Sequence, residues 1–169
     1  MRRTIVLFAT LLLLWTLVTQ LNDALAPLRV HLFAGALFVV FSALTQPRRQ
    51  GLAATLLAGL VCDAHAPVAF GLHLVLFAAA HALLFHLRER VAREDAISMT
   101  VVALLTNLGL FLLLSFTQIH ASPAPASAWP RLIADLAASQ LLLVVATPWF
   151  TALQARALVV ARVPRFDLA

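Results

Sequence analysis

The sequence predicts an all-α integral membrane protein, a single domain built as a bundle of six transmembrane helices. Two properties indicate this class. Of the 169 residues, 63% are hydrophobic and only 11% are charged, with a mean hydropathy of +0.98, whereas a soluble domain is about half apolar and about a quarter charged. The apolar residues also gather in runs close to the roughly 20 residues that cross a bilayer. The short loops that remain leave the function to the bundle itself or to its surface.

Six apolar runs are expected to be the spans. The first follows Arg2 and Arg3 and is interpreted as a retained helix rather than a signal peptide, because it exceeds the usual signal core of about 7–15 residues. Pro27 would also directly follow Ala24-Leu25-Ala26, which looks like a cleavage site, and proline is poorly tolerated at that position. The expected spans cover residues 4–21, 27–45, 51–64, 68–87, 96–117 and 132–153.

Prolines and a short third run give these spans individual features. The second span is expected to start at Pro27, since proline suits the first turn of a helix. The third run has only twelve residues, from Gly51, before Asp63, about 18 Å of helix against a hydrocarbon core of about 30 Å. It is either a short helix extended by its polar flanks or half of a broken helix shielded by its neighbours. In the sixth span, Pro148 is expected to kink the helix or open its backbone.

The arginines predict the orientation. All twelve basic residues are arginines, and basic residues in short loops stay on the cytoplasmic side of a membrane. With both termini in the cytoplasm, ten arginines lie on that side, and only Arg29 and Arg131 lie outside. The arginines are dispersed between apolar runs instead of gathering on one soluble face, so no nucleic-acid partner is expected.

Ionisable side chains near the outer ends of the spans form the candidate site, because such residues are costly in a membrane and are functional candidates by default. Arg131 and Asp135 are spaced i,i+4, which allows an ion pair on one helix face. Arg29 is expected to pair with Asp63 or Asp23. Two interpretations stay open: residues that solvate helix ends, or a polar network that organises a face for a partner or a ligand.

The six histidines raise the question of a metal site. His73 and His81 are eight residues apart, about 80° around a helix, so only Asp63, His65 and His73 are expected to converge, at the mouth between the third and fourth spans. Packing histidines are the preferred interpretation, and no metal or cofactor is expected. Cys62 has no activating base beside it, and no phosphate-binding or dinucleotide motif occurs, so the chain is not expected to be an enzyme.

Small and amide side chains predict helix packing. Gly51-x-x-x-Thr55, Ala54-x-x-x-Ala58 and Ala78-x-x-x-Ala82 have the spacing that lets helix backbones approach closely in lipid. Asn107, near the middle of the fifth span, is expected to form hydrogen bonds across the bundle.

Residues 51–73 carry the most specific pattern in the chain. Gly51 opens the short third segment, Gly59-Leu60-Val61-Cys62-Asp63 closes it, and a loop with Pro67 leads to Phe70-Gly71-Leu72-His73 at the start of the next helix. This pattern resembles the MreD family of rod shape-determining membrane proteins, which typically has a glycine-rich short segment ending in G-x-x-x-D, then a loop and a P-x-G-like helix start. Pro27 and the pair Pro148-Trp149 also look like that family, whereas Ala64-His65-Ala66 departs from its usual small or hydroxyl residues.

The resemblance implies a fold and a role. The fold would be a six-helix bundle in the bacterial inner membrane, similar to the substrate-binding subunits of energy-coupling-factor transporters. The role would be non-catalytic: binding an MreC-like protein and helping couple MreB filaments to peptidoglycan synthesis, in the cell-elongation complex with RodA and a class B penicillin-binding protein. The structural residues of the family motif would be Gly59, Pro67, Gly71 and Pro148.

The alternative function is a solute-binding subunit of an energy-coupling-factor-type transporter, with the same fold. Such a site needs convergent polar and aromatic groups, whereas the chain has no tyrosine and a short, bland outer loop. Its outer pocket would be lined by Asp63, His65, His73, Arg29 and Asp135.

Overall fold

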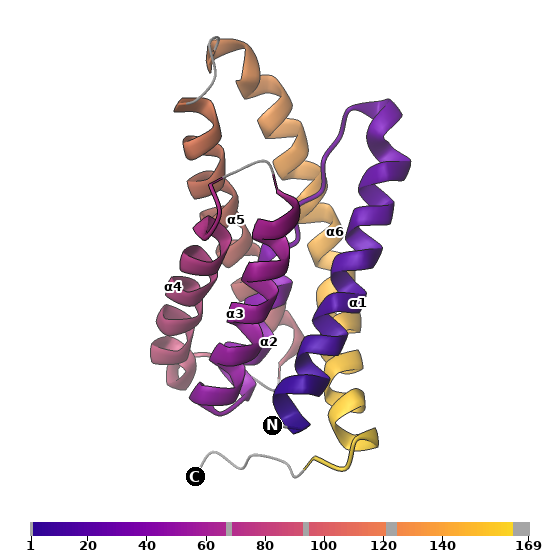
Figure 1. Ribbon diagram of the computed structural model, residues 1–169, viewed down its shortest axis with the longest axis vertical. Helices are drawn as coiled ribbons and strands as arrows, with labels where there is room; N and C mark the ends of the chain where they lie inside the picture. The colour runs from indigo at the N-terminus through magenta and orange to yellow at the C-terminus, as the bar shows by residue number, and fades with distance from the viewer. Residues whose placement is uncertain (1, 67–68, 93–94, 121–124, 164–169) are drawn as a thin grey trace.

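The computed structural model describes residues 2–66, 69–92, 95–120 and 125–163, which form a bundle of α-helices with no strand in these ranges (Figure 1). The α-helices are α1 (Arg2–Leu25), α2 (Gly35–Thr45), α3 (Arg48–His65), α4 (Leu72–Leu87), α5 (Ala96–His120) and α6 (Pro125–Val160). Four of them, α1, α4, α5 and α6, are long and apolar enough to cross a membrane. The expectation of an all-helical membrane protein is confirmed at this level.

The shortest helix, α2, forms the centre of the bundle. All ten residues from Gly35 to Leu44 are buried, and α2 packs against α3, α4, α5 and α6. Its small residues let four helices approach closely, while its apolar side chains fill the core. In contrast, α1 packs on the outside of this group, against α3 and α6 (Figure 1).

The chain between α1 and α2 differs from the expected span over residues 27–45. Pro27 lies in a single 3-10 turn (Ala26–Leu28), and Arg29 follows with a left-handed φ of 55°. The helix starts only at Gly35, so residues 30–34 run as non-helical chain. Apolar composition does not distinguish a short helical segment from a buried extended one, so the sequence pattern alone predicts a helix here.

The short third run is one continuous helix. Because α3 already begins at Arg48 and reaches His65, its 18 residues give about 27 Å of helix. The alternative of a broken third span is therefore wrong, and the break lies in the preceding span. Both small-residue pairs of α3 are buried, whereas Ala82 of the α4 pair is exposed.

The last helix is longer than the expected 132–153. α6 runs from Pro125 to Val160 with Pro130 and Pro148 inside it. Interior prolines are tolerated in membrane helices, where neighbouring groups satisfy the carbonyl that loses its partner. The additional turns carry the outer part of α6 beyond α3 and α4 (Figure 1).

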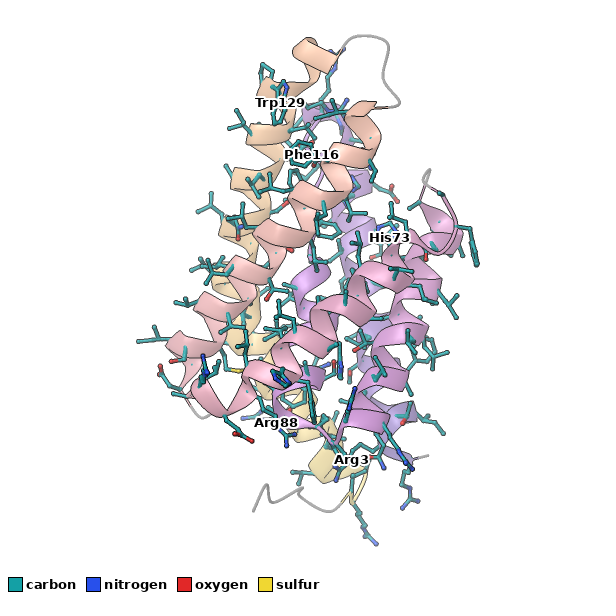
Figure 2. All side chains as sticks on the ribbon, turned by 90° about the vertical axis from the view of Figure 1, so that its left-hand side faces the viewer. Arg3, His73, Arg88, Phe116 and Trp129 are labelled. Carbon is teal, nitrogen blue, oxygen red and sulfur yellow. The ribbon has the colours of Figure 1, made fainter. Side chains whose placement is uncertain are left out.

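The helix ends separate the arginines. The start of α1, the α2–α3 turn and the ends of α4 and α6 share one end of the bundle (Figure 1), which we call the arginine-rich end. Figure 2 shows Arg3 and Arg88 there, with Trp129 at the opposite, outer end. The arginine-rich end is the one expected to face the cytoplasm. The described arginines at this end are Arg2, Arg3, Arg48, Arg49, Arg88, Arg90, Arg156 and Arg162.

Candidate functional site

The G-x-x-x-D pattern meets the start of α4 in one place. A Cβ added to Gly59 would lie 2.7 Å from Leu74 Cα and 3.0 Å from Leu74 N, so a larger residue would push α4 away. Gly71 is required for another reason, because its φ of 95° lies in the left-handed region that favours glycine. We define the α3–α4 junction as Gly59, Asp63, Gly71, His73 and Leu74.

Asp63 caps α4 from the neighbouring helix. Its carboxylate accepts hydrogen bonds from the backbone N–H groups of His73 (2.8 Å) and Leu74 (3.0 Å). His73 Nδ1 also lies 2.9 Å from Asp63 Oδ1 and donates to it when that nitrogen carries the proton. Gly71, at the N-cap position, offers no side chain, so Asp63 supplies the acceptor that the first turn of α4 lacks.

The junction is buried and electrostatically matched. Asp63 is 4% exposed and His73 is 7% exposed. The Asp63 carboxylate faces the N-terminus of α4, where the helix dipole is positive and stabilises a negative charge. The His73 ring packs edge-on against Phe77, with 5.9 Å between the ring centroids. Both carboxylate oxygens are used within the protein, so the arrangement holds α3 and α4 together.

His65 does not join this group. Its Nδ1 lies 2.9 Å from the carbonyl oxygen of Val61, and its ring packs on Trp15 of α1 at a centroid distance of 4.5 Å. The expected convergence is therefore wrong for His65 and correct for Asp63 and His73. Within the ranges that the structure describes, no three His, Cys, Asp or Glu residues form a group that could hold a metal ion.

The non-helical segment before α2 is held by amide side chains from two other helices. Leu32 N donates to Asn22 Oδ1 of α1 (2.7 Å), and Asn22 Nδ2 donates to Leu32 O (3.0 Å). Asn107 of α5 accepts from Ala36 N (3.3 Å) and donates to Phe33 O (3.2 Å). These amides replace the backbone partners that a helix would have supplied, and Asn107 bonds across the bundle as its position predicts.

Two further side chains come from α6. His31 N donates to Asp135 Oδ1 (2.8 Å), and Phe33 N donates to Ser139 Oγ (2.9 Å). Arg131 Nε lies 3.9 Å from Asp135 Oδ2, so the predicted i,i+4 ion pair is present, although the exposure of Arg131 makes such a pair weak. We define the clamp as Asn22, Asn107, Asp135 and Ser139.

Other predicted residues lie apart from both groups. Arg29 forms no ion pair with Asp23 or Asp63, all three of which are described. Arg29 adopts the left-handed conformation that closes the 3-10 turn Ala26–Leu28, and its side chain is exposed at the surface. Pro67 falls outside the described residues, and Pro148 lies inside α6.

Asn22 and Ser139 are the clamp residues that sequence reasoning misses. Asn22 lies one residue beyond the first expected span, 4–21, yet α1 continues through it to Leu25. Ser139 carries one usable signal, its i,i+4 spacing from Asp135, which places the two side chains on one face of α6. Neither signal reveals that the partner is the backbone of residues 31–33.

Two hollows among the described residues lie away from these polar groups. One, between α1, α2 and α3, has no space for a water molecule. An open hollow of about 550 Å³ lies at the arginine-rich end, lined by residues 85–90. Neither hollow is lined by any of the residues expected to form the outer pocket, which are Asp63, His65, His73, Arg29 and Asp135. The dry hollow is lined by Phe8, Leu11, Leu12, Trp15, Phe38, Ala58 and Val61.

No family model, curated protein or solved structure matches the chain. The geometry of the described residues is therefore the basis for a proposed function. Two groups of side chains, the α3–α4 junction and the clamp, form hydrogen bonds with backbone N–H and C=O groups that have no partner within a helix.

Proposed function

We propose that this protein is a non-catalytic membrane scaffold of the bacterial cell-elongation complex, similar to MreD. It binds an MreC-like partner and helps couple MreB filaments to peptidoglycan synthesis by RodA and a class B penicillin-binding protein. The observation that carries the proposal is the convergence of the motif residues: Gly59, Asp63, Gly71 and His73 meet in one junction.

This convergence supports the resemblance because it gives the motif a physical reason. A glycine lets the next helix approach, and an aspartate one turn later caps that helix. Four residues matched by chance in an apolar sequence would have no reason to act on the same helix end. The junction also fixes the start of α4 against the end of α3, which would present a defined surface to a partner at the outer end.

The same contacts disfavour the alternative of a solute-binding transport subunit. Asp63 and Asp135 use their carboxylates on backbone N–H groups of the protein. His65 packs on Trp15, and Arg29 lies at the surface. A solute pocket needs polar groups that converge on free space. Here the two carboxylates bind backbone N–H groups instead, and the other two side chains lie apart from them.

A scaffold needs an outward surface that lipid or partner helices can cover. Large apolar side chains are exposed along the outer helices of the bundle, including Val75 of α4, Leu105 of α5 and Leu141 of α6. Small exposed residues such as Ala82 of α4 would allow a partner helix to pack closely against this face.

Affinity purification from native membranes tests the proposal. The tagged full-length chain is extracted in a mild detergent, and the proteins that accompany it are quantified by mass spectrometry. Enrichment of an MreC-like protein or RodA supports the scaffold. Recovery of ATP-binding-cassette subunits with a bound small molecule would instead identify a transport subunit and overturn the proposal.

A pair of variants links the assembly to the junction. Asp63→Ala should reduce recovery of the MreC-like partner at equal expression, because α4 loses its N-terminal cap. Asp23→Ala, an exposed aspartate at the same end, should leave recovery unchanged. Equal recovery with both variants would contradict a role of the junction in partner binding.

A further inference from the structure

The arginine-rich end contains a group of side chains that the proposed function does not use. The Arg88 guanidinium lies over the Phe85 ring, with Cζ 4.0 Å from the ring centroid, and Arg48 Cζ lies 5.9 Å from the same centroid. Arg48 begins α3, whereas Arg88 follows α4. One aromatic ring thus gathers cations from two helices, and we call Arg48, Phe85 and Arg88 the arginine–phenylalanine cluster.

The ring that gathers these cations is itself held by the core. Phe85 stacks on His81, with 6.2 Å between ring centroids and 12° between their planes. His81 is fully buried and lies so close to Gly51 of α3 that a Cβ added to this glycine would be 3.0 Å from His81 Nε2. A guanidinium that lies against a fixed ring has less rotamer freedom to lose when it binds a ligand.

The charge around the cluster is positive. Eight described arginines lie at this end, where the described acidic residues are Glu89 and Asp95. The Asp95 carboxylate accepts hydrogen bonds from the backbone N–H groups of Ile97 and Ser98 in the first turn of α5. In the described part of the chain, Arg48 forms no ion pair. Like charges gathered in this way attract an anion.

The position of the cluster indicates which anion. The open hollow of about 550 Å³ is lined by the segment Phe85 to Arg90, and this segment closes the apolar span Leu72–Arg90. Figure 2 shows Arg88 at the same end of the bundle as Arg3, which begins α1. The hollow therefore lies at the end of a candidate membrane span, and the ends of such spans meet the lipid phosphates in a bilayer.

We propose that the arginine–phenylalanine cluster binds the phosphate of an anionic phospholipid, such as phosphatidylglycerol, in the leaflet at the arginine-rich end. Guanidinium groups present paired N–H donors that match two phosphate oxygens. The acyl chains stay in the bilayer beside α4. The site depends on these three side chains and on the membrane, and it is independent of the proposed cell-elongation role.

Lipid titration of the purified full-length protein tests this site. Phosphatidylglycerol and phosphatidylcholine are titrated separately into the protein in a neutral detergent, and bound lipid is counted by native mass spectrometry. Selective binding of phosphatidylglycerol is expected. Arg48→Gln with Arg88→Gln should weaken it roughly thirtyfold, the effect of losing two arginines near an anionic lipid.

Matched variants separate a site from general positive charge. Arg156→Gln with Arg162→Gln removes the same charge from the same end but from α6 and the turn after it, and should weaken binding by no more than about threefold because separated surface charges are screened. Phe85→Leu keeps both cations and removes the ring, which should cost about threefold. Size-exclusion profiles and circular dichroism establish that each variant is folded.

Three results would overturn the proposal. They are equal binding of the two lipids, equal losses in the two arginine pairs, and equally tight binding of glycerophosphate in place of the lipid, which would indicate a soluble anion. If the Arg48 and Arg88 double variant does not fold, Phe85→Leu decides alone, because unchanged lipid selectivity in that variant would contradict a site organised by the ring.

Discussion

The α3–α4 junction and the clamp answer the same physical demand in different ways. Backbone groups that have no partner inside a membrane protein cost free energy, so side chains must supply one. At the junction, a single carboxylate, Asp63, serves two N–H groups of α4 and the His73 ring. At the clamp, four side chains from α1, α5 and α6 share the backbone of one non-helical segment.

The two sites differ in the number of side chains that supply these hydrogen bonds, which is one acceptor at the junction and four side chains at the clamp. A junction with one acceptor has a local sequence signature, since the aspartate, the glycine one turn before it and the following helix lie within 16 residues, 59–74. A clamp built from three helices has no such signature. Loss of Asp63 should therefore remove most of the stability that the junction provides. Loss of a single clamp residue should remove only part of the stability that the clamp provides.

The largest expected effect is that of Asp63→Ala. Removing the carboxylate leaves two N–H groups and a buried imidazole without their acceptor, which should lower the free energy of unfolding by about 4 kcal/mol. Reversible unfolding in mixed micelles of denaturing and mild detergent measures this loss. Asp23→Ala, exposed at the same end, is the control and should change stability by less than about 0.5 kcal/mol. Similar losses in the two variants would show that the junction is not concentrated on Asp63.

Gly59→Ala tests the close approach at the same junction. The new Cβ would lie 2.7 Å from Leu74 Cα, and backbone atoms must move to relieve the contact, at a cost of about 3 kcal/mol. Gly109→Ala in α5 is the matched control, because nothing lies within 4 Å of its Cβ position. That control should stabilise the protein by about 0.5 kcal/mol through helix propensity. A neutral Gly59→Ala would mean that α4 can shift freely against α3.

Single clamp variants should cost less than Asp63→Ala. Asn107→Ala removes two hydrogen bonds at a fully buried position and should lower the free energy of unfolding by about 2 kcal/mol. Asn22→Ala, at a half-buried position, should cost about 1 kcal/mol. The double variant should lose more than the sum, by about 0.5 kcal/mol or more, since both side chains hold one segment. Strictly additive losses of unfolding free energy in the same assay would mean that the two side chains hold the segment independently.

The same contrast explains what could be predicted from the sequence. The helical class and the first, fourth and fifth helices follow from apolar runs, which record local preference for the bilayer. The proximity of Asp63 and His73 can also be predicted, because the two residues are close in sequence as well as in space, whereas the capping of α4 by Asp63 is not predicted. The continuous α3 is harder to foresee, since Arg48 and the following polar residues extend an apolar run that is short by itself.

The non-helical segment before α2 could not be predicted, because its cause lies far away in the chain. Residues 30–34 are apolar enough to suggest a helix, and Pro27 fits a helix start equally well. Their conformation depends on Asn107 and Ser139, more than 70 residues away. Arg29 illustrates the same limit, because its charge suggests a partner in sequence terms while the left-handed turn leaves it at the surface.

The smallest expected effect comes from a second capping carboxylate, Asp95, which uses the chemistry of Asp63 at an exposed position just before α5. Its carboxylate accepts hydrogen bonds from the backbone N–H and the hydroxyl of Ser98 and from Ile97 N. These bonds, those from Ser98 above all, hold the pKa of Asp95 below its ordinary value of 3.8.

Because this pKa is lowered on folding, the cap stabilises the protein fully above the ordinary pKa and is lost as the pH falls through the lowered one. The stability of the protein should therefore drop more steeply below about pH 4 than that of Asp95→Asn, whose amide does not titrate. The difference between the two unfolding curves against pH isolates this cap from other carboxylates. Parallel curves would show that an exposed carboxylate at a helix start contributes nothing measurable, and that burial is what gives the Asp63 cap its strength.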